Sequence, residues 1–332
     1  MDNYVTIKVF GSQTSETADD YVYNGKWRFV RDSSCTDYDW LVVIDELPRH
    51  DTGTFSNGTE VLRCPRAHTI LEMQEPVSVK RYGQAYTRQF GHILTNRPFE
   101  AERHPGYTLG RGYMIWYYPG PVDRVKNAPP TPKTKILSTV CSNKQMRYTR
   151  HHDRLTLTAA LAKDIPELDW FGKGVRPIAA KKDALDPYKY HLAVENHIAP
   201  HHWTEKLSDP ILARCLTFYA GDPAIAECLP AAAVIPIPID DPDQAAEIIR
   251  TAIDNGEYEK RLPAIEEARR LILEKYNPWA QTVAVIEEQL SREQQTPLSA
   301  SGDYGLIRSR RRLRRNPLIA LVDGFHHMIR LH

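Results

Sequence analysis

The sequence lacks a charge excess, a patterned set of cysteines and any long apolar run. Its 43 Lys and Arg residues nearly cancel its 42 Asp and Glu residues, which gives a formal net charge of +1 over 332 residues. Bulk charge therefore does not indicate a nucleic-acid-binding protein. The five cysteines are scattered and include no Cys-x-x-Cys pair, which favours reduced thiols over a disulfide framework or a zinc site.

Targeting and membrane-spanning patterns are also absent. The sequence from Met1 to Phe10 enters a strand pattern directly, with neither a basic n-region nor an apolar h-region. No apolar run reaches the roughly 18 residues that a membrane span needs. We therefore expect a cytoplasmic protein without a signal peptide.

The N-terminal third alternates β-rich apolar runs with polar segments, which predicts the strands of a mostly parallel sheet. Two proline-rich stretches, Pro119 to Pro121 and Ala128 to Pro132, then mark a linker, because they cannot continue a helix or a central strand. We predict a first domain over residues 1–127. Its expected strands are Val5 to Phe10, Trp27 to Val30, Trp40 to Ile44 and Thr69 to Met73.

Strand and helix patterns alternate more sharply after the linker, which predicts a second α/β sheet with helices on both faces. We assign this domain to residues 128–295, with Asp243 and Asn277 as expected helix caps. Its expected strands are Lys135 to Val140, Leu168 to Phe171, His191 to Val194, Leu216 to Tyr219 and Ala233 to Ile237. Its expected helices cover about 151–163 and 204–214, a segment after Asp222, and 243–254, 257–276 and 277–294.

One stretch of this second domain joins a strand to a helix through a short polar loop. The strand over His191 to Val194 ends in Glu195-Asn196, and a helix opens at Thr204 with Lys206 in its first turn. Open α/β sheets bind phosphorylated ligands where a strand leads into a helix, because free N–H groups and the helix dipole favour an anion. The stretch therefore predicts a phosphate site to which Lys206 adds a full positive charge.

This stretch belongs to a longer order of motifs: Tyr188-Lys-Tyr190, Glu195-Asn196, Thr204-Glu205-Lys206 and Phe218 to Pro223. The order resembles the donor-binding core of the fucosyltransferases of glycosyltransferase family 10, and the resemblance covers residues 135 to 240 best. It implies an α/β fold of the GT-B type, with two Rossmann-like domains facing each other across a cleft. It also implies an inverting transfer of L-fucose from GDP-fucose to a glycan hydroxyl, in bacterial surface polysaccharide synthesis.

Such a transfer needs positively charged side chains that neutralise the departing diphosphate. In the family, a Ser-Asn pair followed by an arginine at the start of an amphipathic helix supplies a phosphate contact. Asn143 and Arg154 match that pattern, and Lys206 is the second expected cation. The gap before the arginine is longer here, so Arg147 and Arg150 remain alternatives to Arg154.

Polar side chains around the same motif are candidates for contacts with the nucleoside and the sugar. The amide of Asn196 can donate and accept hydrogen bonds, and the carboxylate of Glu205 can accept two ribose hydroxyls. His202 replaces an aromatic residue that relatives commonly carry before the Thr-Glu-Lys motif. Its imidazole can stack or form a hydrogen bond in the donor site.

The expected catalytic base lies at the acidic end of a strand in the first domain. Glu75, directly before Pro76, resembles the family's Glu-Pro segment, and Glu72 is the alternative because the two alignments differ by a short gap. Strand carboxyl ends are where catalytic groups of such sheets lie. Burial would raise the pKa of either carboxyl toward neutral pH.

No metal or other cofactor is expected. Asp37-Tyr-Asp39 spells the Asp-x-Asp of metal-dependent transferases, but it precedes a strand, so we interpret it as a turn. The pairs His151-His152 and His326-His327 have no third ligand at a suitable spacing. Cationic side chains would then neutralise the leaving group without metal.

The C-terminal segment 296–332 places the basic cluster Arg308 to Arg315 before the apolar run Pro317 to Val322. It predicts either peripheral contact with anionic membrane, near a lipid-linked glycan acceptor, or a helix packed back on the first domain.

Two alternatives to this function also stay open. The donor can be a different nucleotide sugar, or the chain can be a noncatalytic glycan- or nucleotide-binding protein on the same scaffold.

Overall fold

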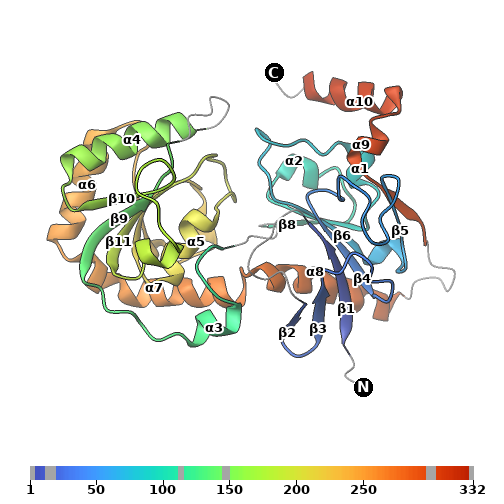
Figure 1. Cartoon of the computed structure of the whole chain (residues 1–332), viewed down its shortest axis with the longest axis horizontal. Helices are drawn as coiled ribbons and strands as arrows, with labels where there is room; N and C mark the ends of the chain where they lie inside the picture. Colours follow the sequence, from blue (N-terminus) through green and yellow to red (C-terminus); the bar gives the residue numbers. More distant parts are fainter. Residues whose placement is uncertain (1–3, 12–19, 111–115, 144–149, 297–303, 329–332) are drawn as a thin grey trace. The chain divides into compact units, whose positions relative to one another are not determined.

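The computed structural model describes residues 4–11, 20–110, 116–143, 150–296 and 304–328. The chain divides into two compact units (Figure 1). Unit 1 combines Met1–Tyr113 with Pro278–His332, and unit 2 is the continuous segment Met114–Asn277. Each unit contains its own sheet of wholly or mainly parallel strands.

Unit 1 is built on a seven-stranded sheet in which all neighbouring pairs are parallel except β2 and β3. β1, the first strand along the chain, lies between β3 and β4, so the direction of winding reverses there. In sheet order the strands are β2 (Tyr21–Tyr23), β3 (Trp27–Val30), β1 (Val5–Phe10), β4 (Trp40–Ile44), β6 (Thr69–Met73), β7 (His92–Thr95) and β8 (Tyr107–Leu109). The four strands expected in this region have the predicted bounds.

Helix α8 (Pro278–Gln295) returns the chain to unit 1 and packs on its sheet. The Trp279 ring stacks on Tyr21, with 5.3 Å between ring centroids, and lies 4.4 Å from the Phe29 ring. The Thr282 hydroxyl donates a hydrogen bond to the Glu72 carboxylate on β6. One helix therefore connects the β2–β3 edge of the sheet with its centre.

The C-terminal segment continues in unit 1. β14 (Leu306–Arg308) pairs antiparallel with β5 (Thr59–Val61), and α9 (Arg310–Leu313) and α10 (Pro317–Met328) lie beside the short helix α1 (Gln84–Thr87) (Figure 1). The segment is therefore packed on unit 1, and contact with a membrane stays a prediction. The remaining unit 1 helices are η1 (Arg66–His68) and α2 (Pro98–Ala101).

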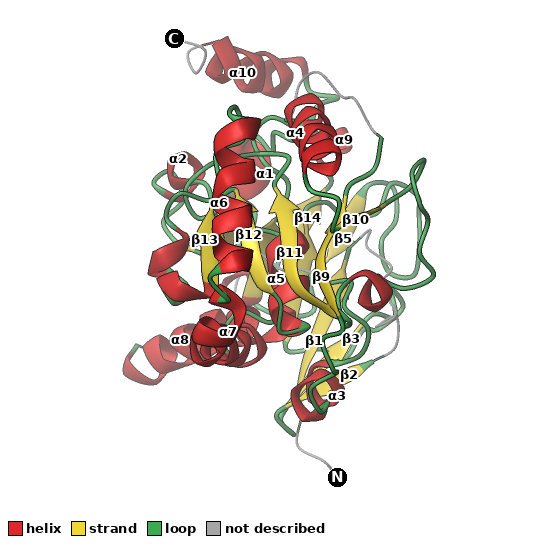
Figure 2. Cartoon of the chain, turned by 90° about the vertical axis from the view of Figure 1, so that its left-hand side faces the viewer, coloured by secondary structure: helices red, strands yellow, loops and turns green. Residues whose placement is uncertain are grey.

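Unit 2 is a five-stranded, wholly parallel sheet in the order β10-β9-β11-β12-β13. Helices cover both of its faces: α4 packs with α6 on one face and α5 packs with α7 on the other, as Figure 2 shows with α6 before the sheet and α5 behind it. The strands are β9 (Lys135–Val140), β10 (Leu168–Phe171), β11 (Tyr188–Val194), β12 (Leu216–Ala220) and β13 (Val234–Pro236). The helices are α3 (Val122–Asn127), α4 (His151–Asp164), η2 (Lys181–Ala184), α5 (Glu205–Leu212), η3 (Ile225–Glu227), η4 (Ala231–Ala233), α6 (Pro242–Asp254) and α7 (Glu257–Glu274).

Helix caps differ from the sequence expectation in one case. α6 begins one residue earlier than expected, and its N-cap is Asp241, whose carboxylate accepts the Gln244 N–H at 3.0 Å. Asp243, the expected cap, lies inside the first turn. Pro242 explains the shift, because proline at the first helical position lacks the N–H that a helix would leave unpaired there.

The unit boundaries also differ from the expected domains 1–127, 128–295 and 296–332. Residues 114–127 belong to unit 2, where the Tyr117 N–H donates to the Asp209 carboxylate at 3.0 Å and the Arg269 guanidinium donates to the Val125 carbonyl. Residues 278–295 belong to unit 1. The proline-rich stretch therefore lies within unit 2. Among the described residues, no helix has the length and apolarity to cross a membrane.

Candidate functional site

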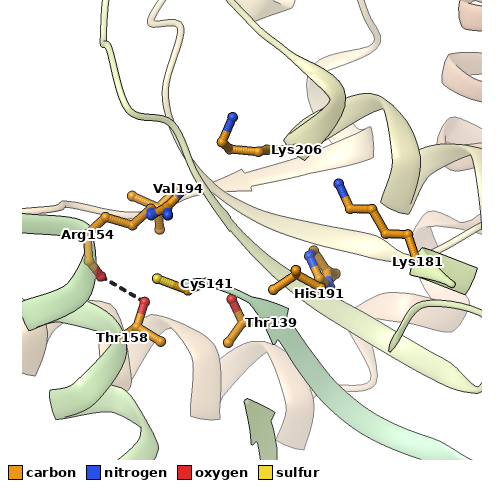
Figure 3. Close-up of a pocket in the computed structure, with 9 residues that line it drawn as sticks. Thr139, Cys141, Arg154, Thr158, Lys181, His191, Val194 and Lys206 are labelled. Atoms are coloured by element: carbon orange, nitrogen blue, oxygen red, sulfur yellow. Dashed lines mark hydrogen bonds between the residues drawn. The ribbon is translucent and has the colours of Figure 1, made fainter. Parts of the chain in front are cut away.

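A small cavity opens in unit 2 at the point where the strand order reverses. β9 lies between β10 and β11, and α4 and α5, which follow β9 and β11, pack on opposite faces of the sheet. Parallel α/β sheets bind ligands at such switch points, beyond the carboxyl ends of the strands. The cavity has a volume of about 10 Å³, room for roughly one water molecule. Its lining residues are Thr139, Val140, Cys141, Arg154, Thr158, Lys181, His191, Val194 and Lys206 (Figure 3).

Arg154 reaches this cavity from the first turns of α4. The residue is only 6% exposed, and its Nε atom is buried without a hydrogen-bond partner among the described residues. The alternative Arg150 is instead a half-exposed surface residue that pairs with Asp153 at 3.3 Å and Asp240 at 3.1 Å. Arg147, the other alternative, lies outside the described residues. A buried cation with an unused donor is the feature expected of an anion site.

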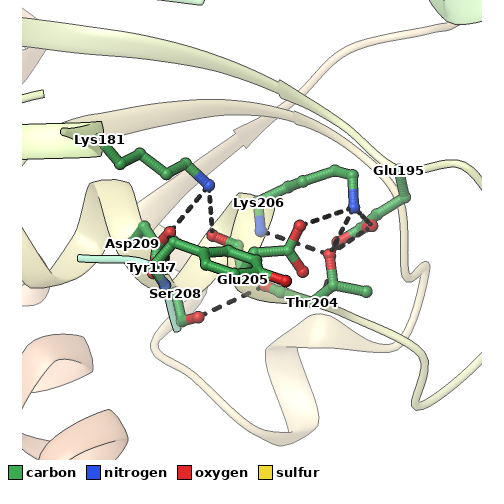
Figure 4. A network of polar contacts seen from close by, with 8 residues as sticks. All are labelled: Tyr117, Lys181, Glu195, Thr204, Glu205, Lys206, Ser208 and Asp209. Atoms are coloured by element: carbon green, nitrogen blue, oxygen red, sulfur yellow. Dashed lines mark hydrogen bonds and ion pairs between the residues drawn. The ribbon is translucent and has the colours of Figure 1, made fainter. Parts of the chain in front are cut away.

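Lys206 enters the cavity from the amino end of α5, where the side chain is 17% exposed. Its ammonium group donates to Thr204 Oγ1 and to Glu205 Oε1, both at 3.1 Å, and lies 3.6 Å from Glu195 Oε2 (Figure 4). These contacts hold the long side chain in one position. The cavity thus has two ammonium groups, those of Lys181 and Lys206, and one guanidinium in its lining.

Glu195 occupies the amino end of α5 in place of an external anion. Its carboxylate accepts the Thr204 N–H at 2.8 Å and the Thr204 hydroxyl at 2.8 and 2.9 Å. The Thr204 side chain in turn accepts the Lys206 N–H as the helix N-cap. A diphosphate would therefore contact the side chains of Lys206 and Arg154, because the backbone donor at Thr204 is already paired.

The charges of this network are set by burial and by each other. Burial opposes ionisation of Glu205, but Lys206 and Lys181 outweigh it and lower the pKa of Glu205 from 4.5 to about 2. Burial also lowers the pKa of Lys206, yet Glu205 and Glu195 raise it above its usual value. Burial raises the pKa of Glu195 although Lys206 opposes this. At neutral pH the Glu205–Lys206 pair is therefore ionised.

The same network includes two residues that the sequence did not single out. Lys181 pairs with the fully buried Asp209 at 2.8 Å and donates to the Glu205 carbonyl at 3.4 Å (Figure 4). Asp209 also accepts the Tyr117 N–H. Lys181 comes from η2, a short element without a recognisable motif, so only the fold brings it beside α5.

His191 lines the cavity from β11. The Ser138 hydroxyl donates to the Ala184 carbonyl at 2.5 Å and lies 2.9 Å from His191 Nδ1. Because a hydroxyl has one hydrogen and a carbonyl only accepts, Nδ1–H must donate to Ser138. Nε2 is then the unprotonated ring nitrogen. Burial, followed by Lys181 and Lys133, lowers the pKa of His191 from 6.5 to about 3.

This neutral histidine predicts a pH dependence of stability. Below pH 6.5 the unfolded chain binds a proton at His191 that the folded chain excludes until about pH 3. Its contribution to the free energy of unfolding is complete above pH 6.5. The contribution falls as the pH decreases, with a slope that approaches about 1.4 kcal/mol per pH unit. Urea unfolding between about pH 5 and 6.5 should show a shallower slope for His191→Gln than for the unsubstituted chain. The exposed His50, changed to glutamine, should leave the slope unaltered; equal slopes for all three proteins would disprove this role.

The other expected donor contacts lie on loops of unit 2 outside the cavity lining. Asn196 Oδ1 is buried and has no hydrogen-bond partner within the described ranges, which fits a group that awaits a ligand. Asn143 is exposed and lies against Gly174, where an added Cβ would meet the Asn143 amide at 2.3 Å. His202 is buried edge-to-face against His197, with ring centroids 5.1 Å apart.

Glu72 and Glu75, the two candidate bases, belong to unit 1. Glu72 is fully buried on β6 and accepts the Thr282 hydroxyl, whereas Glu75 is half-buried in the loop after that strand. The guanidinium of Arg97 donates to the Glu75 carbonyl and holds this loop. Of the two carboxylates, only Glu75 is accessible to a hydroxyl substrate in this conformation.

Metal candidates from the sequence do not form a cluster. The Asp39 carboxylate accepts the Thr6 N–H at 2.8 Å, as expected of a turn before β4. Within the part of the chain that the structure describes, no group of three or more His, Cys, Asp or Glu side chains is arranged to hold a metal. All five cysteines are free thiols. Whether the chain uses a metal stays a prediction.

Comparison with known proteins identifies the fold. No known family model matches the sequence. The chain is similar to the crystal structure of an alpha1,3-fucosyltransferase, with a TM-score of 0.50 and 13% identity over 86% of this chain and 90% of that one. It is also similar to an alpha1,3-fucosyltransferase with GDP-fucose (TM-score 0.44, 14% identity, 78% and 81% covered). A pneumococcal O-GlcNAc transferase, GtfA, in complex with UDP and GlcNAc, is similar at a TM-score of 0.40 (12% identity, 77% and 56% covered).

The first of these similarities confirms the predicted fold class. Two α/β units, each with a parallel sheet, correspond to the two Rossmann-like domains of the GT-B type. Sequence identity of 13% supports this fold alone. The activity has to be argued from the residues of the site.

Proposed function

We propose that the chain is a glycosyltransferase that binds a nucleoside diphosphate sugar in unit 2. The observation that carries this proposal is that Arg154 and Lys206 meet at the switch point of the sheet, around a cavity that would have to widen to admit a diphosphate. Arg154 disfavours the charge of Lys206, although Glu205 and Glu195 outweigh that effect, and a bound diphosphate would relieve it. The unpaired Arg154 Nε and Asn196 Oδ1 are further groups that a ligand would satisfy.

The chemical step follows from these assignments. Glu75 takes the proton of the acceptor hydroxyl, and the hydroxyl oxygen attacks the anomeric carbon of the donor sugar. The bond between that carbon and the diphosphate oxygen breaks, with inversion of configuration. Arg154 and Lys206 stabilise the negative charge that develops on the diphosphate. Glu195 and Glu205 position Lys206 through the contacts described above.

The donor we propose is GDP-fucose, used without a metal. The support is the motif order Glu195-Asn196 and Thr204-Glu205-Lys206, which resembles that of the family 10 fucosyltransferases. Asn196 and His202 would then contact the donor from loops at the carboxyl edge of the sheet, and Asn143 would lie near the diphosphate. A cytoplasmic enzyme of bacterial polysaccharide synthesis would have a glycan or lipid-linked glycan as acceptor.

Peripheral membrane contact through Arg308–Arg315 belongs to the same proposal. On α10, the helix after this cluster, Leu318 and Leu321 are 73% and 71% exposed. Exposed leucines beside arginines suit the boundary of an anionic bilayer.

A nucleotide panel tests the donor assignment. GDP and GDP-fucose should raise the melting temperature, with stabilisation of about 2.7 kcal/mol when the ligand is at 100 times its Kd. Saturation-transfer NMR should show fucose-ring signals that GDP suppresses, and incubation with a glycan acceptor should release GDP. Stabilisation by another nucleotide and not by GDP would replace the donor. Binding without hydrolysis or transfer would show a noncatalytic protein.

A further inference from the structure

Unit 1 contains a second charged pocket, far larger than the cavity of unit 2. Its volume is about 460 Å³, within the range of small-molecule sites. The loop after β4 lines one side and the segment Ser309 to Arg315 lines the other. β4 is a neighbour of β1 at the point where the strand order of unit 1 reverses, so the pocket lies where parallel sheets bind ligands.

The lining of this pocket is strongly cationic. Five guanidinium groups face two carboxylates, those of Glu46 and Asp51, which leaves an excess of three positive charges. The five arginines are Arg49, Arg310, Arg311, Arg312 and Arg315. Such an excess on one concave surface attracts anions and is a cost to the empty protein.

Two of these arginines are tied to the protein. Arg310 Nε lies 3.0 Å from a Glu46 carboxylate oxygen, and Arg312 donates to the Asn57 carbonyl. The guanidinium groups of Arg49, Arg311 and Arg315 have no hydrogen bond or ion pair with any described residue. Three cationic groups therefore remain available to a ligand.

The arginine segment is held in a fixed geometry by its backbone. Gln89 bonds both the N–H of Arg308, at 2.9 Å, and its carbonyl, at 3.0 Å. Ser309 is buried and caps α9, and its N–H donates to the Gly58 carbonyl at 2.9 Å. Gly58 has a φ of +69°, and a Cβ there would meet Ser309 Oγ at 3.0 Å. A flexible basic tail would show none of this close packing.

We propose that this pocket binds a phosphate or diphosphate ester. Guanidinium forks match phosphate oxygens in bidentate geometry, and three available forks suit a multiply charged group. The carboxylates of Glu46 and Asp51 can accept hydroxyls of the esterified group. The site belongs to unit 1 and does not depend on the donor assignment in unit 2.

Calorimetric titration of the full chain with pyrophosphate tests the pocket. The double variant Arg311→Ala/Arg315→Ala removes two lining cations that make no contact with described residues, so the fold should persist. Binding should weaken by roughly 30-fold or more, because a hydrogen bond to a charged group is worth about tenfold in affinity. The variant Arg154→Gln distinguishes binding in unit 1 from binding in unit 2, since it should remove only the pyrophosphate bound in unit 2.

The matched control is Arg308→Ala/Arg314→Ala, which removes the same charge from the same segment without touching the pocket lining. It should weaken binding by less than about threefold, through long-range charge alone. Equal losses for the two double variants would overturn the proposal, as would no loss in either.

Vesicles distinguish a lipid headgroup from a soluble ester. Phosphatidylglycerol vesicles that bind the chain, are displaced by pyrophosphate and lose affinity in the lining variant would identify a lipid headgroup as the source. Pyrophosphate binding without vesicle binding would identify a soluble ester. Vesicle binding without any pyrophosphate binding assigned to unit 1 would overturn the pocket in favour of surface attraction.

Discussion

Arg154→Gln is expected to slow sugar transfer by roughly 10²- to 10³-fold, the usual effect of removing one group that stabilises charge in the transition state. Charge builds on the diphosphate as the glycosidic bond breaks, so kcat should fall more than the KM for the donor rises. The protein should stay folded. Arg154 has an unpaired buried Nε and opposes the charge of Lys206, so its loss removes a cost from the empty site.

The matched control for this prediction is Arg150→Gln, at the start of the same helix. Its ion pairs with Asp153 and Asp240 are at the surface, where such pairs contribute little. Steady-state transfer rates should stay within about a factor of two, and urea unfolding should report intact stability for both variants. Similar rate losses at the two positions would contradict the assignment of the phosphate contact to Arg154.

Glu75→Gln is expected to lower kcat by about 10²- to 10⁴-fold, because an amide cannot take the proton of the acceptor hydroxyl. Donor binding should be retained, since the change lies in unit 1 and the cations for the diphosphate lie in unit 2. Steady-state transfer rates, together with donor affinity by calorimetry, check both parts.

Glu72→Gln is the comparison for that experiment. Glutamine keeps an oxygen that can accept the Thr282 hydroxyl, so the packing of α8 should survive. Because Glu72 is fully buried, the substitution should change transfer by less than about threefold, with any effect seen in stability. A folded Glu72→Gln protein without activity, beside an active Glu75→Gln protein, would move the base to Glu72.

Several strands could be predicted from the sequence because they are buried on both faces, although β7 (His92–Thr95), equally buried, was not among the expected ones. Trp40–Ile44 is wholly apolar and Thr69–Met73 is wholly buried, and each has the bounds that the pattern indicated. Arg154 and Lys206 could be predicted as cations of one site because each matches its own family motif, an arginine after Ser-Asn and the lysine of Thr-Glu-Lys. Local patterns of this kind need no knowledge of distant contacts.

Other features depend on contacts that no local pattern records. The amphipathic pattern of α8 is compatible with either unit, and only the rings of Tyr21 and Phe29 show where Trp279 packs. Lys181 and Asp209 read as ordinary surface and helix charges until the fold pairs them at 2.8 Å. Glu195 was expected only as the end of a strand, and its place at the amino end of α5 appears in three dimensions alone.

The assembly of unit 1 from both ends of the chain sets an order of events during synthesis. A ribosome must release all of Met114–Asn277 before it delivers α8. A nascent chain ending at residue 277 already contains everything that unit 2 needs, while the β6 carboxylate of Glu72 still awaits the hydroxyl of Thr282. Unit 2 can therefore mature first, and the earlier-translated sheet must wait, with an apolar face exposed to chaperones, until α8 is translated.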